Sequence, residues 1–375
     1  MRSDLDERVH RRLLDAADDQ QLDDDALTEL VRAEDPLLDA ASVAGVVGRM
    51  RARMVGAGPI EPLLSDPAVT DVLVNGPGPV WVEREGRLER SDVTLDAGAI
   101  DLLVERVVSR LGLRADRATP MVDARMPDGS RVHVVLPPLA VDGPYVAVRR
   151  FAAVTLPLSR FCAPPVAELL VQAVADGRNL VVCGGTGAGK TTFLNALCQH
   201  VPAGERVVTV EDAAELRLPG DHVVRLEARP ATPDGLAAVT VRDLLRAALR
   251  MRPDRLVVGE VRGGEAVDLL QALNTGHDGS LSTCHANSPV DGLRRLESLC
   301  LMGGLGLPLE AVREQLSSAL DLVVQVARGP GGTRRVVAVE EVGPDPTSPV
   351  RTLPLAVHGL VLTEPLRPPR RTVSS

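Results

Sequence analysis

The stretch Gly184-Gly185-Thr186-Gly187-Ala188-Gly189-Lys190-Thr191-Thr192 decides the fold of this 375-residue chain. It matches G-x-x-x-x-G-K-[ST], a phosphate-binding loop whose backbone N–H groups surround phosphate oxygens. Lys190 is the only lysine among 42 basic residues. A slim ammonium can enter such a loop, whereas a broad, flat guanidinium cannot. The loop therefore predicts a bound nucleoside triphosphate, with Lys190 on its β- and γ-phosphates and Thr191 on Mg²⁺.

The residues on both sides of this loop have the pattern that it needs. Asn179–Cys183 (NLVVC) indicates a short buried strand, and Thr191–His200 (TTFLNALCQH) has apolar residues at helical spacing. The four glycines are expected to adopt backbone angles that aim N–H groups at the phosphates, and the helix N-terminus adds its positive end. A chance glycine-rich turn before a helix is the weaker alternative, because the flanks and the unique lysine agree.

Composition excludes several classes of function. The net charge is −9, and the first 40 residues hold 13 acidic and 5 basic side chains, so the rest of the chain is near neutral. This balance gives no strong nucleic-acid signal, and aromatic residues are too few for a base-stacking platform. No apolar run approaches the ~18 residues of a membrane span, and no signal peptide is indicated. Five scattered cysteines without C-x-x-C predict neither disulfides nor zinc, so we expect a cytoplasmic protein.

Hydrophobic periodicity predicts an α/β protein with two domains. The larger domain alternates strands and helices, which favours a mostly parallel sheet. Thr240-Val241-Arg242-Asp243 is a capping box that should open a helix running to Met251. The predicted segments are an acidic, mostly helical leader (1–55), a smaller α+β domain (56–150), a linker (151–165), the larger α/β domain (166–342) and a loose Pro-rich tail (343–375).

Three polar sites follow predicted strand ends downstream of the loop. Leu256–Glu260 has four apolar and small residues before an acid, the pattern that delivers a carboxylate to Mg²⁺ or to the attacking water. Glu211 and Asp212 follow a second strand, and either could assist. His285 follows a polar Ser-Thr turn and could sense the γ-phosphate. A surface acid is the alternative for Glu260, and a packed, hydrogen-bonded histidine is the alternative for His285.

Four segments together resemble the type II/type IV secretion ATPase superfamily. They are 184–192, 210–216 (VEDAAEL), 252–263 (RPDRLVVGEVRG) and 276–288 (GHDGSLSTCHANS), which look like its Walker A, Asp box, Walker B and His box. Two further segments, 58–64 (GPIEPLL) and 122–132 (VDARMPDGSRV), resemble the tight-adherence (Tad/Flp) pilus branch, which includes conjugal-transfer ATPases. The cysteine cluster of some type II members is absent, which argues against that branch.

The resemblance implies a RecA-like ATPase domain with a smaller α+β domain before it. It implies ATP and Mg²⁺ at 184–192, catalytic roles for Lys190, Glu260, Glu211 and His285, and metal contacts from Thr191, Glu211 and Glu260. It further implies a hexameric ring that is peripheral at the inner face of the membrane and drives platform proteins of a pilus or secretion machine. Arginines from the smaller domain or a neighbouring subunit would complete the site, and the candidates are Arg125, Arg131, Arg149 and Arg150.

Three other functions remain open at this stage. A DNA-transfer (conjugation) motor is a variant of the first reading and is weakened by the missing basic field. A small-molecule or nucleotide kinase also uses a phosphate-binding loop, but it would need an acceptor-binding lid. A nucleotide-gated scaffold with little turnover is disfavoured by the intact Glu260.

Overall fold

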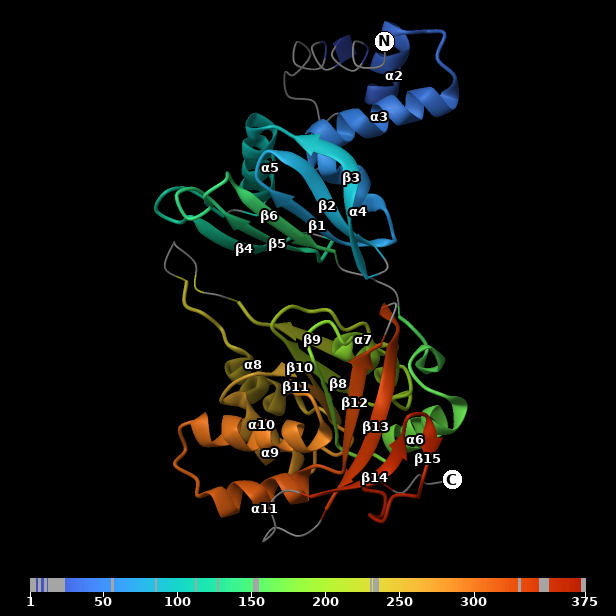
Figure 1. Ribbon diagram of the computed structural model, residues 1–375, viewed down its shortest axis with the longest axis vertical. Helices are drawn as coiled ribbons and strands as arrows, with labels where there is room; N and C mark the ends of the chain where they lie inside the picture. Colours follow the sequence, from blue (N-terminus) through green and yellow to red (C-terminus); the bar gives the residue numbers. More distant parts are fainter. Residues whose placement is uncertain are drawn as a thin grey trace. The chain divides into compact units, whose positions relative to one another are not determined.

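The computed structural model describes residues 5, 8, 9, 12, 24–54, 57–84, 86–111, 113–126, 128–150, 155–229, 231, 236–329, 332–343 and 351–371. The chain forms two compact units, Met1–Ala152 and Ala153–Ser375 (Figure 1). Their boundary falls within the segment expected as a linker. The end of that segment belongs to the second unit, because Leu158 and Phe161 are buried in its core. No helix of the described residues is both long enough and apolar enough to span a bilayer.

The first unit begins with helices and continues into an antiparallel sheet. The helices α2 (Asp24–Glu34) and α3 (Ala40–Met54) share a small apolar cluster, in the region expected as a helical leader. The short helices η1 (Gly58–Ile60) and α4 (Glu61–Ser65) lead into the sheet. The helix α5 (Ala97–Arg110) begins at Asp96, whose carboxylate accepts a hydrogen bond from the Ala99 N–H.

Among the described residues of this unit, the sheet has six strands in the order β3-β2-β1-β6-β5-β4, and its strand pairs are antiparallel. Alternate valines of these strands pack against Ile100, Leu103 and Val107 of α5. The strands are β1 (Val69–Asn75), β2 (Gly78–Arg84), β3 (Arg87–Leu95), β4 (Met121–Arg125), β5 (Arg131–Val135) and β6 (Tyr145–Arg149).

The described part of the second unit is built on a nine-stranded sheet in the order β15-β14-β13-β12-β7-β11-β10-β8-β9. The six strands from β12 to β9 are parallel, and β13, β14 and β15 extend the sheet antiparallel. The strands are β7 (Leu180–Gly184), β8 (Val207–Glu211), β9 (Val223–Glu227), β10 (Arg255–Val261), β11 (Leu281–His285), β12 (Leu322–Arg328), β13 (Arg334–Val342), β14 (Thr352–Val357) and β15 (Leu360–Val361).

Helices cover both faces of this sheet and give a three-layer α/β domain (Figure 1). Along β7, Val181 and Cys183 face the layer of α8 to α11, whereas Leu180 and Val182 face α6 and α7. The helices are η2 (Leu158–Arg160), α6 (Pro164–Ala175), α7 (Lys190–Cys198), α8 (Val241–Ala248), η3 (Leu249–Met251), α9 (Glu265–Leu273), α10 (Pro289–Met302) and α11 (Leu309–Ala319). The predicted capping box is confirmed, since Thr240 and Asp243 exchange hydrogen bonds at the start of α8.

Two sequence-based expectations are wrong. Ser282 and Thr283 do not form a turn, because they lie in the buried strand β11, where the Thr283 hydroxyl donates to the Gly259 carbonyl oxygen at 2.7 Å. Residues 351–371 are not a loose tail, because β14 pairs with β13 and Leu355 and Ala356 are buried in the core. The prolines of this segment argued against a strand. Pro354 is nevertheless tolerated in β14, because this strand lies near the edge of the sheet, where fewer N–H donors are needed.

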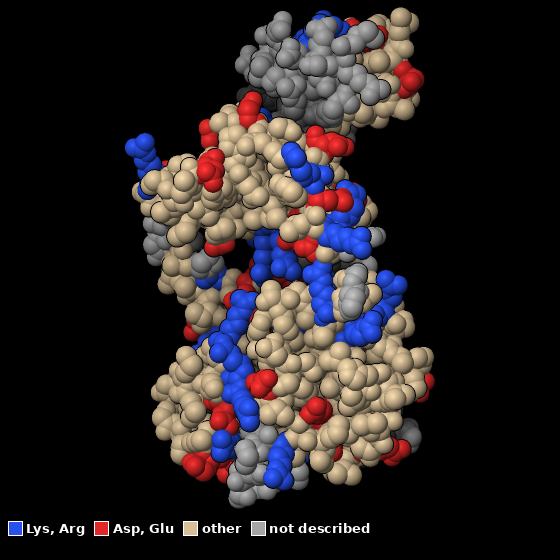
Figure 2. All heavy atoms as spheres, in the orientation of Figure 1, with Lys and Arg blue, Asp and Glu red and all other residues tan. Residues whose placement is uncertain are grey.

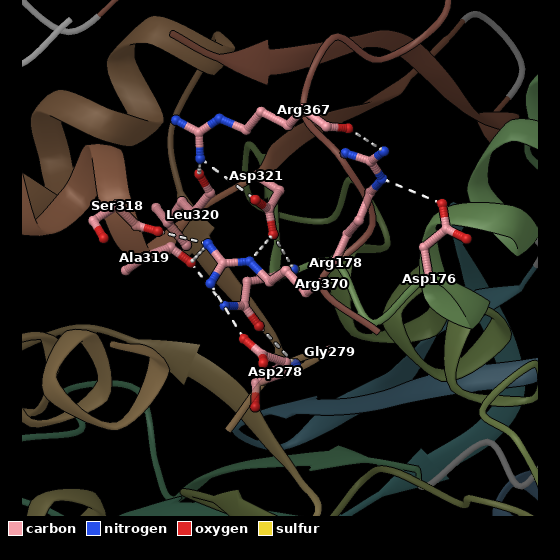
Figure 3. Close-up of polar contacts among 12 residues, drawn as sticks. Asp176, Arg178, Asp278, Gly279, Ser318, Ala319, Leu320, Asp321, Arg367 and Arg370 are labelled. Atoms are coloured by element: carbon pink, nitrogen blue, oxygen red, sulfur yellow. Dashed lines mark hydrogen bonds and ion pairs between the residues drawn. The ribbon is translucent and has the colours of Figure 1, made fainter. Parts of the chain in front are cut away.

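Residues 366–371 form an ionic strap along the amino ends of the parallel strands (Figure 3). Arg370 Nε lies 2.5 Å from Asp321 Oδ2, just before β12, and its Nη1 lies 3.2 Å from Asp278 Oδ1, before β11. Arg367 donates to the Leu320 carbonyl oxygen at 2.7 Å, and its own backbone N–H donates to Glu341 at 2.9 Å. The strap therefore supplies guanidinium partners to Asp321 and backbone N–H donors to Glu341, two carboxylates that are only 2–3% exposed.

We predict that Arg370→Gln lowers the free energy of unfolding by about 2 kcal/mol, because it leaves the buried Asp321 carboxylate with fewer partners. Chemical denaturation of both proteins measures this change. Arg294→Gln is the matched control, since its ion pair with Asp291 is exposed and should contribute less than about 1 kcal/mol. Equal stability of wild type and Arg370→Gln would mean that the strap is not part of the folded domain.

Candidate active site

The predicted site residues meet at the carboxyl edge of the parallel strands. Strand β7 ends at Gly184 and continues into the phosphate-binding loop, and Gly184 pairs directly with His285 at the end of β11. Strand β10 carries Glu260, and its pairing of Val258 with Val210 brings the ends of β10 and β8 side by side. Parallel strands thus bring Lys190, Glu260 and His285 together although up to 95 positions separate them in the sequence.

The glycines of the loop have different physical roles. Gly187 and Gly189 have φ of 71° and 87°, a left-handed backbone that aims the loop into α7. Gly184 instead has an ordinary backbone, but a Cβ there would lie 2.4 Å from the Val326 carbonyl oxygen of β12. The expectation that all four glycines serve backbone angles is therefore wrong for Gly184, where close packing of two strands requires glycine.

Lys190 begins α7 and folds back over the loop. Its Nζ donates to the carbonyl oxygens of Gly184 and Gly185, each at 3.1 Å. Desolvation lowers the pKa of Lys190, while the negative charge of Glu260 opposes that shift and the positive charge of Arg262 adds to it. The Lys190 ammonium is thus held beside the loop, where it interacts electrostatically with the Glu260 carboxylate.

Glu260 is a partly accessible carboxylate of the site. Its side chain is 22% exposed, and its Oε2 accepts a hydrogen bond from Arg262 Nη2 at 2.6 Å. Arg262 Nη1 also lies 3.3 Å from Asp212 Oδ2, on the loop that follows β8. Glu260, Arg262 and Asp212 therefore form one charged group at the carboxyl edge.

Glu211 occupies a different position from the one expected of a catalytic or metal-binding group. It is 2% exposed, and its carboxylate accepts hydrogen bonds from the backbone N–H groups of Glu215 (2.8 Å) and Leu216 (3.0 Å). Burial raises the pKa of Glu211, and these backbone donors only partly offset that shift. In this structure the side chain holds the turn after β8, and Asp212 is the carboxylate that faces the site.

Three of the four candidate arginines of the first unit lie in one row. Arg125 pairs with Arg131 across β4 and β5, and Arg131 pairs with Arg149 across β5 and β6. Directly opposed residues of antiparallel strands share a face, so these three arginines form a row on one face of the sheet, and Arg149 is paired with Asp71 of β1. Arg150 lies elsewhere, because its guanidinium donates to the carbonyl oxygens of Asp66 and Val69.

Two further arginines beside the loop escaped sequence analysis. Arg334 Nη1 donates to Thr192 Oγ1 at 3.5 Å, and a Cβ on Gly189 would lie 2.5 Å from Arg334 Cδ. A Cβ on Gly187 would similarly lie 3.5 Å from Arg328 Nη1. Both side chains come from β12 and β13, which are more than a hundred positions downstream, so no local pattern connects them to the loop.

Two of the predicted metal ligands, Thr191 and Glu260, suit a Mg²⁺ ion that is carried by a nucleotide. This ion prefers oxygen ligands and takes only one or two of them from the protein when phosphates supply others. The Thr191 hydroxyl at the start of α7 and the accessible Glu260 carboxylate fit that chemistry. Glu211 fits it poorly, because both of its carboxylate oxygens already accept backbone N–H groups.

The fold and the site define a RecA-like P-loop protein with a smaller α+β domain before it. Residues 53–341 match the model of the type II/IV secretion system protein family, and the chain belongs to this family. It is 44% identical over 302 residues to a putative conjugal transfer protein of Mycobacterium tuberculosis, covering 77% of this chain and 85% of that protein.

One further relative agrees with this assignment, and a solved structure shares the fold. The type IV secretion system protein VirB11 of Brucella suis is 35% identical over 324 residues, covering 77% of this chain and 89% of that protein. The solved structure of the Legionella pneumophila ATPase DotB has a TM-score of 0.56 at 19% identity, covering 75% of this chain and 79% of that one. The last likeness supports the fold.

We predict that Glu211→Ala lowers the free energy of unfolding by about 1–3 kcal/mol, because it leaves the buried Leu216 N–H without an acceptor. Glu260→Ala should change stability by less than about 0.5 kcal/mol, because its carboxylate is partly exposed. Thermal and chemical denaturation of the two variants check the difference. A stable Glu211→Ala protein would reopen a catalytic role for Glu211.

Proposed function

We propose that this protein hydrolyses ATP with Mg²⁺ and drives pilus assembly or protein secretion in a Tad-like type II/IV system. The observation that carries the proposal is the meeting of Lys190, Glu260 and His285 at one edge of the sheet. We place the protein in the cytoplasm, peripheral at the inner face of the membrane and in contact with platform proteins there. Membership of the secretion family and the segments that resemble the Tad/Flp branch support this assignment.

In the proposed reaction, water attacks the γ-phosphorus and the bond to the β–γ bridging oxygen breaks, so ADP leaves with the electron pair. Glu260 accepts a proton from the attacking water and later releases it to solvent. Lys190 and the loop N–H groups stabilise the charge on the transferring oxygens. We assign contact with the γ-phosphate to His285, and its pairing with Gly184 on the adjacent strand supports this role. Mg²⁺, held by Thr191 and Glu260, would neutralise charge on the β- and γ-phosphates.

We further propose that the active form is a hexameric ring, as the family resemblance implies, in which first-unit arginines complete the site. The row of Arg125, Arg131 and Arg149 supports this idea. Arginines that share one face of a sheet offer N–H donors that can bind an anion. The γ-phosphate is the anion that the proposed reaction supplies.

A DNA-transfer motor is the second candidate, because one relative is named as a putative conjugal transfer protein. The near-neutral charge of residues 41–375 disfavours it. On the face of the second unit that Figure 2 draws, acidic side chains lie among the basic ones. Stimulation of ATP hydrolysis by DNA at physiological salt would favour the DNA motor, whereas turnover far below one per minute would favour a nucleotide-gated scaffold.

We predict that Glu260→Gln retains ATP binding but lowers kcat by about 10²-fold or more, because the amide cannot accept the proton of water. Lys190→Ala, with the same fold, should lose ATP binding as well. Equilibrium binding of ATP and steady-state hydrolysis measure the two effects separately. If Lys190→Ala hydrolyses ATP at the wild-type rate, the proposed function is wrong.

We predict that specific ATPase activity rises with protein concentration, because arginines of one subunit act on the nucleotide of another. Arg149→Ala and Lys190→Ala should each be inactive, yet a mixture of the two should regain part of the activity, since some sites receive an intact half from each variant. Arg150→Gln is the control outside the arginine row. A mixture as inactive as its components would place the arginines in the same subunit as the loop.

A further inference from the structure

Arg262 bridges the two accessible carboxylates of the site. Its guanidinium lies 2.6 Å from Glu260 Oε2 and 3.3 Å from Asp212 Oδ2, and 61% of its side chain is exposed. The bonds to the carboxylates keep the pKa of Arg262 above its usual value. An exposed bridge of this kind is weak, so a better anion can exchange for the carboxylates.

The backbone of Arg262 is fixed while its side chain reaches the site. The N–H groups of Arg262 and Gly263 donate to Glu265 Oε1 at 2.6 and 2.7 Å, and the Glu265 side chain is buried at the start of α9. Only rotations of the side chain are therefore needed to move the guanidinium. Its charge already acts on Lys190, the residue assigned to the β- and γ-phosphates.

The bridge also engages one oxygen of the group proposed as the general base. A general base needs an oxygen lone pair directed at the attacking water, and Glu260 Oε2, which Arg262 holds at 2.6 Å, is not free for that task. The γ-phosphate of ATP has three acceptor oxygens and more than one negative charge, which makes it a stronger partner for a guanidinium than a single carboxylate. Binding of ATP, but not of ADP, thus offers Arg262 an alternative to Glu260.

We propose that Arg262 is a γ-phosphate switch. Its guanidinium exchanges between two partners: the carboxylates of Glu260 and Asp212, with which it pairs in this structure, and the γ-phosphate of bound ATP. Moving to the γ-phosphate releases Glu260 Oε2 to accept the proton of water. This inference rests on the proposed ATPase function. It assigns Asp212 a second role, as the carboxylate that competes with ATP for Arg262 and receives it again after phosphate has left.

The test compares affinities for a non-hydrolysable ATP analogue and for ADP, both with Mg²⁺, in the full-length protein. Arg262→Gln should weaken binding of the ATP analogue by about 10-fold and leave ADP binding within about twofold, because only the analogue carries a γ-phosphate. Asp212→Asn should tighten binding of the ATP analogue by about two- to threefold without changing ADP binding, because it removes one competitor for Arg262. Arg294→Gln, an exposed arginine of α10, is the matched control.

If Arg262 only supported the local structure, the affinities for the two nucleotides would change differently. Equal weakening of both nucleotides by Arg262→Gln, or no weakening of either, would overturn the switch. An Asp212→Asn protein with unchanged preference for the ATP analogue would overturn the competition between Asp212 and the γ-phosphate. Lys190→Ala, measured alongside, separates the two proposals: wild-type affinity in that variant refutes the ATPase site itself, whereas a loss there with an unchanged Arg262→Gln refutes the switch alone.

Discussion

The parallel pairing of β7 between β11 and β12 is the constraint on which the site depends. It sets Gly184 opposite His285 and leaves no room for a Cβ between Gly184 and the backbone of β12. Because the carboxyl ends of parallel strands share one edge, the loop, the Walker B acid and the histidine meet without any loop having to bring them together. The arrangement of the candidate site residues therefore depends on the order of the strands as well as on residue type.

The opposite edge of the same sheet, at the amino ends of the parallel strands, contains buried carboxylates. Asp321 and Glu341 are nearly inaccessible, and burial of a carboxylate is unfavourable unless charged or hydrogen-bonding partners surround it. Arg370 of the strap and the backbone N–H of Asn179 donate to Asp321 (Figure 3), and the backbone N–H groups of Leu366 and Arg367 donate to Glu341. The domain thus extends beyond the family match, which ends at residue 341. The buried ion pairs lie at the amino ends of the parallel strands, and the candidate active site lies at their carboxyl ends.

Local sequence patterns predicted the elements whose conformation depends on neighbouring residues in the chain. These are the phosphate-binding loop, the capping box at Thr240 and the strand that contains Glu260. Strand β11 was missed because its Ser282 and Thr283 are polar, and their burial depends on neighbours that the sequence does not display. Strand β14 was missed because its proline suggested a tail.

The sequence by itself determined the RecA-like α/β fold and indicated Lys190, Glu260 and His285 as candidate site residues, because motifs with fixed spacing point to them. Only the tertiary structure decided which charged groups face the site. It buried Glu211 under backbone N–H groups, placed Arg262 between Glu260 and Asp212, and brought Arg334 to the loop. These outcomes depend on strand pairing between distant segments, and no periodicity within one segment contains that information.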